Sequence, residues 1–136
     1  MKVTIFQDVF KKNKEHAHVI QLATALKRIK EGKSRTLIEA VRNGSKDFKK
    51  KLPVVLFSGE FEARNDEALT KHSQFIVLDF DHIDVASSKA LLSTDPYVYS
   101  CWVSPSGDGL KALVKVSNPE RHRDHFRALR TYFNKQ

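Results

Sequence analysis

The sequence predicts an α+β domain with a helical elaboration toward the amino terminus. Three observations indicate this class. The short apolar run at residues 75–81 ends in two aspartates and is typical of a buried strand. Two more strand-like runs, 97–103 and 110–116, are joined by a tight Ser/Pro/Gly connection, as in a β-hairpin. Apolar residues at helical spacing occur both before and after these strands.

Length and composition fit one soluble domain spanning residues 1–136. The chain is long enough to bury a core, and its 40% hydrophobic and 29% charged residues are ordinary for a globular protein. No apolar stretch approaches the roughly 20 residues of a membrane helix. Residues 1–8 lack the apolar core of a signal peptide, and the single cysteine, Cys101, excludes an internal disulfide. We therefore expect a cytoplasmic protein without membrane contact.

The first half of the chain predicts two strands and two helices. Strands are expected at residues 3–6 and 53–57. A polar stretch at 7–18 separates the first strand from the helices, and the second strand follows the helices. One helix ends at Gly32, and the next begins at Ser34 and ends at Asn43-Gly44. Another short helix is expected within 64–71. The apolar positions of the two main helices are Val19, Leu22, Ala23, Leu26 and Ile29, and Leu37, Ile38 and Val41.

The second half predicts strands at 75–81, 97–103 and 110–116, with a short helix at 86–92 between the first two. The sequence Asn118-Pro119-Glu120 is a good start for a last helix, with Asn at the cap and Pro at the first position. Trp102 is expected to pack in the core, whereas the sequence leaves the placement of Tyr97 and Tyr99 open.

Asp79 and Asp81 are the strongest candidate for a functional site. They lie on one face of the predicted strand, with Cα atoms about 6–7 Å apart. Like charges at the end of a buried strand repel and lose hydration unless a cation compensates them. Mg²⁺ usually takes one or two carboxylates from a protein. The pair therefore indicates a metal site, although both residues could instead cap the following segment.

The loop between the two hairpin strands is a candidate anion site. Gly107 and Gly109 let backbone N–H groups approach an anion, and Ser104 and Ser106 add hydroxyl donors. Lys111, at the start of the next strand, can reach the same anion. The alternative is a glycine-containing hairpin loop with an incidental lysine.

The net charge of +8, from 24 Lys and Arg against 16 Asp and Glu, favours polyanionic partners, with nucleic acid first among them. The densest basic cluster includes Lys49, Lys50 and Lys51. These lysines are candidates for phosphate contact. The alternative is a solvated helix face or a tether.

These motifs, in this order, resemble the VirE N-terminal domain family, regarded as a branch of the archaeo-eukaryotic primase (prim-pol) superfamily. The resemblance covers nearly the whole chain. The segments that carry it are Leu52-Pro53, Phe57-Ser58-Gly59-Glu60-Phe61, Arg64, His72-Ser73, Val77-Leu78-Asp79-Phe80-Asp81-His82, Asp95-Pro96-Tyr97-Val98, Ser104-Pro105-Ser106-Gly107 and Gly109-Leu110-Lys111.

The resemblance implies an RRM-like core, in which an antiparallel-rich sheet is backed by helices, and it implies a role for each motif. Asp79 and Asp81 match the carboxylates that hold Mg²⁺ or Mn²⁺ for nucleotidyl transfer. Residues 104–111 match the motif that contacts nucleotide phosphates, with Lys111 as a catalytic candidate. Arg64 matches a position that can contact phosphate, and His82 adjoins the carboxylates. The implied partners are DNA or RNA, nucleoside triphosphates, and a helicase or downstream replication domain.

Two departures from the family pattern keep a second function open. Many primases have a histidine where this chain has Lys111, and lysine does not reproduce the neutral imidazole. The superfamily also supplies a third metal-binding aspartate after the last helix, so the sequence is expected to lack the carboxy-terminal part of the domain. The first hypothesis is thus a primase-like module of a mobile-element or phage replication system. The second is a catalytically silent nucleic-acid-binding or assembly module. A haloacid-dehalogenase phosphatase is disfavoured, because the 55 or so residues after Asp81 read as one hairpin and one helix.

Overall fold

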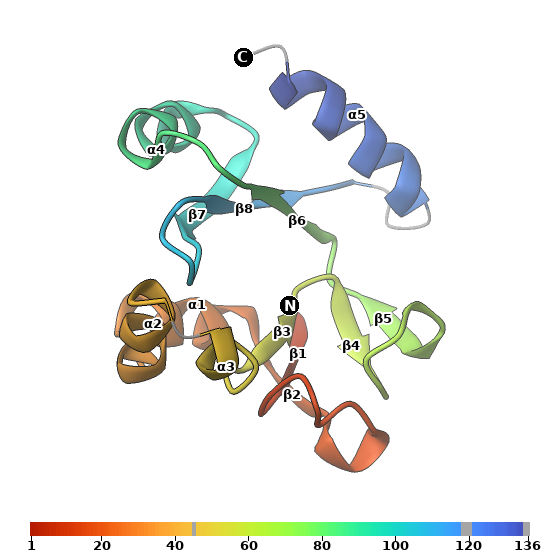
Figure 1. The fold of residues 1–136 in the computed structure, drawn as a ribbon. Coiled ribbons are helices and arrows are strands. Elements are labelled where there is room, and N and C mark those ends of the chain that lie inside the picture. The colour runs from red at the N-terminus through yellow and green to blue at the C-terminus, as the bar shows by residue number, and fades with distance from the viewer. Residues whose placement is uncertain (45, 118–120, 135–136) are drawn as a thin grey trace. The chain divides into compact units, whose positions relative to one another are not determined.

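The strands pair into three antiparallel sheets in the computed structural model, which describes residues 1–44, 46–117 and 121–134 (Figure 1). The chain forms two compact units. Unit 1 contains residues 1–73 and 105–107, and unit 2 contains residues 74–104 and those from 108 onward. The mixture of helices and antiparallel sheets confirms the α+β class. The finer RRM-like assignment and the single-domain boundaries stay predictions.

Unit 1 is built on a sheet of order β2-β1-β3. These strands are β1 (Lys2–Phe6), β2 (His18–Gln21) and β3 (Val54–Leu56). A separate hairpin pairs β4 (Gly59–Phe61) with β5 (Leu69–His72). Short 3₁₀ turns occupy Lys14–His16 and Asp66–Ala68. The helices are α1 (Leu22–Lys30), α2 (Arg35–Arg42) and α3 (Lys46–Lys49).

A buried threonine joins β1 to the β4 strand. Thr4 is fully buried, and its hydroxyl donates to the Gly59 carbonyl at 2.9 Å and accepts from the Phe61 amide at 2.8 Å. Gly59 has φ +153°, and a Cβ there would overlap the carbonyl oxygen of Lys71 on β5. Glycine is therefore required at this crossing, where two backbones approach closely.

Unit 2 has a sheet of order β6-β8-β7, formed by β6 (Phe75–Phe80), β7 (Val98–Val103) and β8 (Leu110–Lys115). Helix α4 (Val85–Thr94) follows β6, and α5 (His122–Asn134) follows β8. Both helices lie on the same side of this sheet (Figure 1). The core between sheet and helices contains Ile76, Leu78, Leu92, Leu110, Ala112, Val114, Val116 and Phe133.

Three features of the α4 region and the β7 strand follow from local chemistry. The Asp84 carboxylate caps α4 by accepting from the Ser87 amide. An irregularity between Val98 and Ser100 places Val98 on the core side together with Cys101 and Val103. Trp102 is only half-buried and lies in register with Lys111, outside that core, so the prediction of a core tryptophan is wrong for this cluster.

Two local predictions in unit 1 are wrong. The first helix begins at Leu22, because Val19 and Ile20 pair with β1 as part of β2. Residues 64–71 form a 3₁₀ turn and the start of β5 instead of a helix, because the Glu60 and Phe61 backbones supply their pairing partners. The proposed cap at 118–120 lies outside the described residues. Among the residues that are described, no helix is long and apolar enough to cross a membrane.

Candidate functional site

The site is centred on the carboxyl end of β6, where the strand leaves the core. Leu78 is almost fully buried, whereas Asp79 and Asp81 are exposed. Since side chains alternate along a strand, Asp79 lies on the face opposite Leu78 and Phe80, which pack against the helices. The sequence prediction that β6 delivers carboxylates to its end is thus consistent with the structure.

Lys111 forms an ion pair with Asp79. The two residues are directly opposite each other in the β6–β8 ladder, and Lys111 Nζ lies 2.7 Å from Asp79 Oδ1. The side chains are 33% and 54% exposed, respectively, so solvent screens the pair and its stabilisation is about 0.2–1 kcal/mol. Lys111 therefore contacts a carboxylate directly, and it offsets the charge of one of the two aspartates, Asp79.

Gly109 brings the loop backbone against the end of β6. A Cβ at this position would overlap the Phe80 carbonyl oxygen and would lie 3.3 Å from Asp81 Oδ1. The Gly109 carbonyl accepts from the Ser104 amide at 2.9 Å, and the Asp108 carbonyl accepts from the Ile83 amide at 3.1 Å. The two sequence motifs, one on β6 and one on the loop, therefore meet through backbone contacts within unit 2.

Asp108 is a site residue that the sequence reasoning missed. Its Oδ2 lies 2.8 Å from Nδ1 of His82, which has the left-handed φ of 54°. His82 was predicted to adjoin the carboxylates, and it does so with its ring oriented by Asp108. An acidic residue between Gly107 and Gly109 reads as turn chemistry, so only the fold reveals this contact.

The predicted phosphate-binding loop is divided between the units. Ser104, Gly109 and Lys111 belong to unit 2 with the aspartates, and Ser104 is buried. Ser106 and Gly107 group with unit 1, where Gly107 has φ +85° and lies beside the Arg42 side chain. Three of the five loop residues thus belong to the same unit as the aspartates, and two of them, Gly109 and Lys111, contact the end of β6. The role of the loop in binding phosphate stays a prediction.

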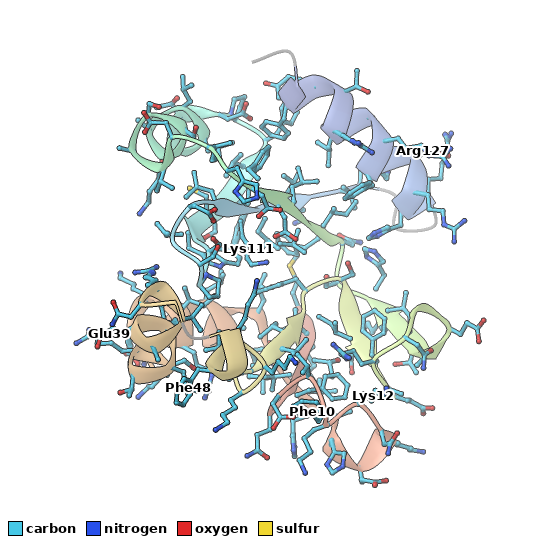
Figure 2. The ribbon with its side chains drawn as sticks, viewed as in Figure 1. Phe10, Lys12, Glu39, Phe48, Lys111 and Arg127 are labelled. Carbon is cyan, nitrogen blue, oxygen red and sulfur yellow. The ribbon has the colours of Figure 1, made fainter. Side chains whose placement is uncertain are left out.

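The predicted nucleic-acid contacts all lie in unit 1. Lys49, Lys50 and Lys51 are exposed at and after α3, and Lys51 Nζ lies 4.9 Å from the centroid of the Phe48 ring (Figure 2 labels Phe48). Arg64 is half-buried and donates from Nη2 to the Val9 carbonyl at 3.1 Å. Its Nε is buried without a hydrogen-bond partner among the described residues. Arg64 therefore binds the backbone of the segment between β1 and β2. A phosphate contact by this residue stays a prediction.

The two carboxylates at the end of β6 fit a divalent ion whose other ligands are waters or substrate phosphates. Asp81 makes no hydrogen bond or ion pair with any described residue, and Asp79 shares only one oxygen with Lys111. Within the described part of the chain, no group of three His, Cys, Asp or Glu side chains is arranged around a metal position. Two carboxylates suit Mg²⁺, which commonly keeps waters and binds substrate phosphates.

Comparisons with known proteins identify the family but not the activity. The family model described as BT4734-like, N-terminal domain matches residues 47–135, a range that includes Asp79, Asp81 and Lys111. This family is related to domains of the VirE N-terminal type, while membership of the VirE family itself is not shown. Searches of curated proteins and of solved structures found no significant match. By the family match, which covers more than half of its length, the chain belongs to the BT4734-like N-terminal domain family.

Proposed function

We propose that this chain is a primase/polymerase-like domain of a mobile-element or phage replication system. In this proposal it binds Mg²⁺ or Mn²⁺ together with nucleoside triphosphate and DNA or RNA, and it works beside a helicase or downstream replication domain. One observation carries the proposal. The Asp79–Lys111 pair, Asp81 and the Gly109 loop meet at one end of β6. Carboxylates, a lysine and a glycine-rich backbone are the groups that metal-assisted phosphate chemistry needs.

Each of these residues has a distinct task in the proposed site. Asp79 and Asp81 would hold the divalent ion, which would supply positive charge to neutralise triphosphate oxygens and to activate an attacking 3′-hydroxyl. Lys111 exchanges its carboxylate partner for a phosphate oxygen when nucleotide enters, because both anions lie within reach of one flexible ammonium. Gly109 keeps the loop close to β6, and Ser104 supports it through its amide.

The proposal is tested by nucleotide incorporation with Mn²⁺ or Mg²⁺ on a primed template. Wild type and the matched control Glu39→Gln, an exposed acid in unit 1, should incorporate equally (Figure 2 labels Glu39). Asp79→Asn and Asp81→Asn should lose incorporation, since each removes a charged ligand while keeping the side-chain shape. Equal incorporation by all four proteins would refute the assignment of the aspartates.

A second candidate function is supported by the Asp79–Lys111 ion pair itself. The lysine already supplies a cation to one carboxylate, and no three-ligand metal group occurs among the described residues. These facts favour a catalytically silent module that binds nucleic acid or assembles with a partner. This alternative predicts salt-sensitive nucleic-acid binding that is unchanged in Asp79→Asn and weakened when Lys49, Lys50 and Lys51 are replaced by Gln. Binding that does not respond to salt would contradict it.

A further inference from the structure

The outer face of α5 carries three arginines that the site at β6 does not use. Arg123, Arg127 and Arg130 follow i, i+4, i+7 spacing and therefore form one stripe along the helix, the α5 arginine face. All three are exposed, and none makes an ion pair or side-chain hydrogen bond with a described residue. Figure 2 shows Arg127 at the outer side of α5.

The rest of α5 leaves these charges uncompensated. The only acidic residue of the helix, Asp124, is held by Arg121 at 3.1 Å. The opposite side of α5 packs into the core of unit 2 through Leu129 and Phe133. The helix therefore presents a fixed row of cations to solvent, on a rigid support.

We infer that the α5 arginine face binds the phosphate backbone of a nucleic acid. A rise of 1.5 Å per residue separates successive arginines by about 6 Å and about 4.5 Å along the helix axis. A nucleic-acid strand carries one charge per roughly 3.4 Å, so successive arginines can contact phosphates that are one or two nucleotides apart. The planar fork of arginine matches phosphate oxygens bidentately. Phe126 flanks the stripe, is 39% exposed, and offers a ring on which an unpaired base can stack.

Two other occupants fit the face less well. A basic helix binds a membrane surface by inserting its apolar side, but the apolar side of α5 is already buried against the sheet. An acidic protein segment offers irregular carboxylates, whereas a continuous row of arginines and the chain's net charge of +8 suit a repeating polyanion. The inference rests on the proposed handling of nucleic acid, but it concerns a different surface, because Asp79 and Lys111 lie on the sheet face that α5 does not cover.

The test measures binding of a short fluorescent oligothymidylate, and of a duplex of equal length, over a range of NaCl concentrations in the presence of EDTA. The triple variant Arg123→Gln, Arg127→Gln, Arg130→Gln should lower the magnitude of the single-strand salt slope by about 2, at about 0.7 per lost phosphate contact. Because this electrostatic contribution vanishes near 1 M salt, affinity at about 0.1 M should fall roughly 100-fold. A slope change seen only with the duplex would mean that the α5 arginine face contacts the phosphates of double-stranded nucleic acid.

Three controls separate this inference from its alternatives. The corresponding triple Arg→Lys variant keeps the charge and should keep the slope. The triple variant Lys2→Gln, Arg28→Gln, Lys30→Gln removes the same charge from exposed positions of unit 1 and should change the slope by much less. Equal losses in the two Gln variants, or loss of binding to anionic vesicles without loss of oligonucleotide binding, would overturn the inference. The slopes are measured in EDTA, where no divalent ion is bound, so the predicted loss in the Arg→Gln variant does not depend on metal binding at β6. Failure of the β6 site and failure of the α5 arginine face therefore give different results.

Discussion

Replacing Lys111 by Gln should change metal binding and nucleotide binding in opposite directions. Lys111 Nζ lies 2.7 Å from Asp79 Oδ1, so a divalent ion must displace an ammonium to use that oxygen. The variant keeps the length of the side chain approximately and removes only its charge. It therefore isolates the electrostatic role of the lysine.

The size of the metal effect follows from the exposure of the pair. Ion pairs as exposed as this one, with side chains 33% and 54% exposed, stabilise by about 0.2–1 kcal/mol. Freeing Asp79 should thus tighten binding of Mn²⁺ alone by about 1.4- to 5-fold. Repulsion between the ammonium and the ion has the same sign and can only increase the gain. Triphosphate binding should weaken in the same variant, because the cation that would pair with a phosphate is gone.

The assay is calorimetric titration of Mn²⁺, followed by titration of nucleoside triphosphate into the metal-loaded protein. Lys115→Gln is the matched control, since Lys115 is exposed on the same face of β8 but stands opposite Phe75 instead of Asp79. If Lys111→Gln weakens binding of Mn²⁺ alone, or if both variants respond equally, the reasoning that the lysine competes with metal at Asp79 is wrong.

Three further predictions concern the frame that holds the site. Thr4→Val should lower the free energy of unfolding by about 1–3 kcal/mol, because it removes the buried hydroxyl that bonds the Gly59 carbonyl and the Phe61 amide. The exposed Thr70→Val should have a small effect in the same urea titration. Leu92→Ala should lower the free energy of unfolding by about 2–5 kcal/mol, because it leaves a cavity in the unit 2 core. Leu91→Ala, at an exposed neighbouring position, should change it by no more than about 0.5 kcal/mol in thermal unfolding. Similar losses for both variants would contradict the assigned core. Gly109→Ala should displace the loop from β6 and lower the metal-dependent affinity for triphosphate. Changes in the amide chemical shifts of Ile83 and Ser104 in NMR spectra would report that displacement, and unchanged shifts would argue against it.

Periodic segments of the fold were predictable from the sequence, and segments stabilised by distant partners were not. The residues of β6 and α5 carry their own signals, an apolar run in one case and apolar residues at helical spacing in the other. The β5 segment, Leu69–His72, has mostly exposed side chains, and its structure comes from pairing with β4, so no local pattern announces it. The same holds for Val19. Its spacing from the apolar residues that follow indicates a helix, but in the structure it pairs with Thr4 of β1 as part of a strand.

The candidate site shows a similar division. Asp79 and Asp81 were found because two carboxylates at the end of an apolar run are electrostatically unusual. The Asp79–Lys111 register required knowledge of which residues face each other across two strands separated by 32 positions in the chain. Asp108 required the backbone course of the loop, because its partner His82 belongs to a different turn. Pair contacts of this kind depend on the fold and not on spacing in the sequence.

Calorimetric titration of Mn²⁺ and nucleoside triphosphate into wild type, Asp79→Asn, Asp81→Asn and Glu39→Gln measures the proposed role of β6 most directly. We predict that wild type and Glu39→Gln bind triphosphate more tightly with Mn²⁺ than without it, and that both aspartate variants lose this dependence. Metal-dependent triphosphate binding that is equal in all four proteins would contradict the assignment of the end of β6 as the metal and nucleotide site.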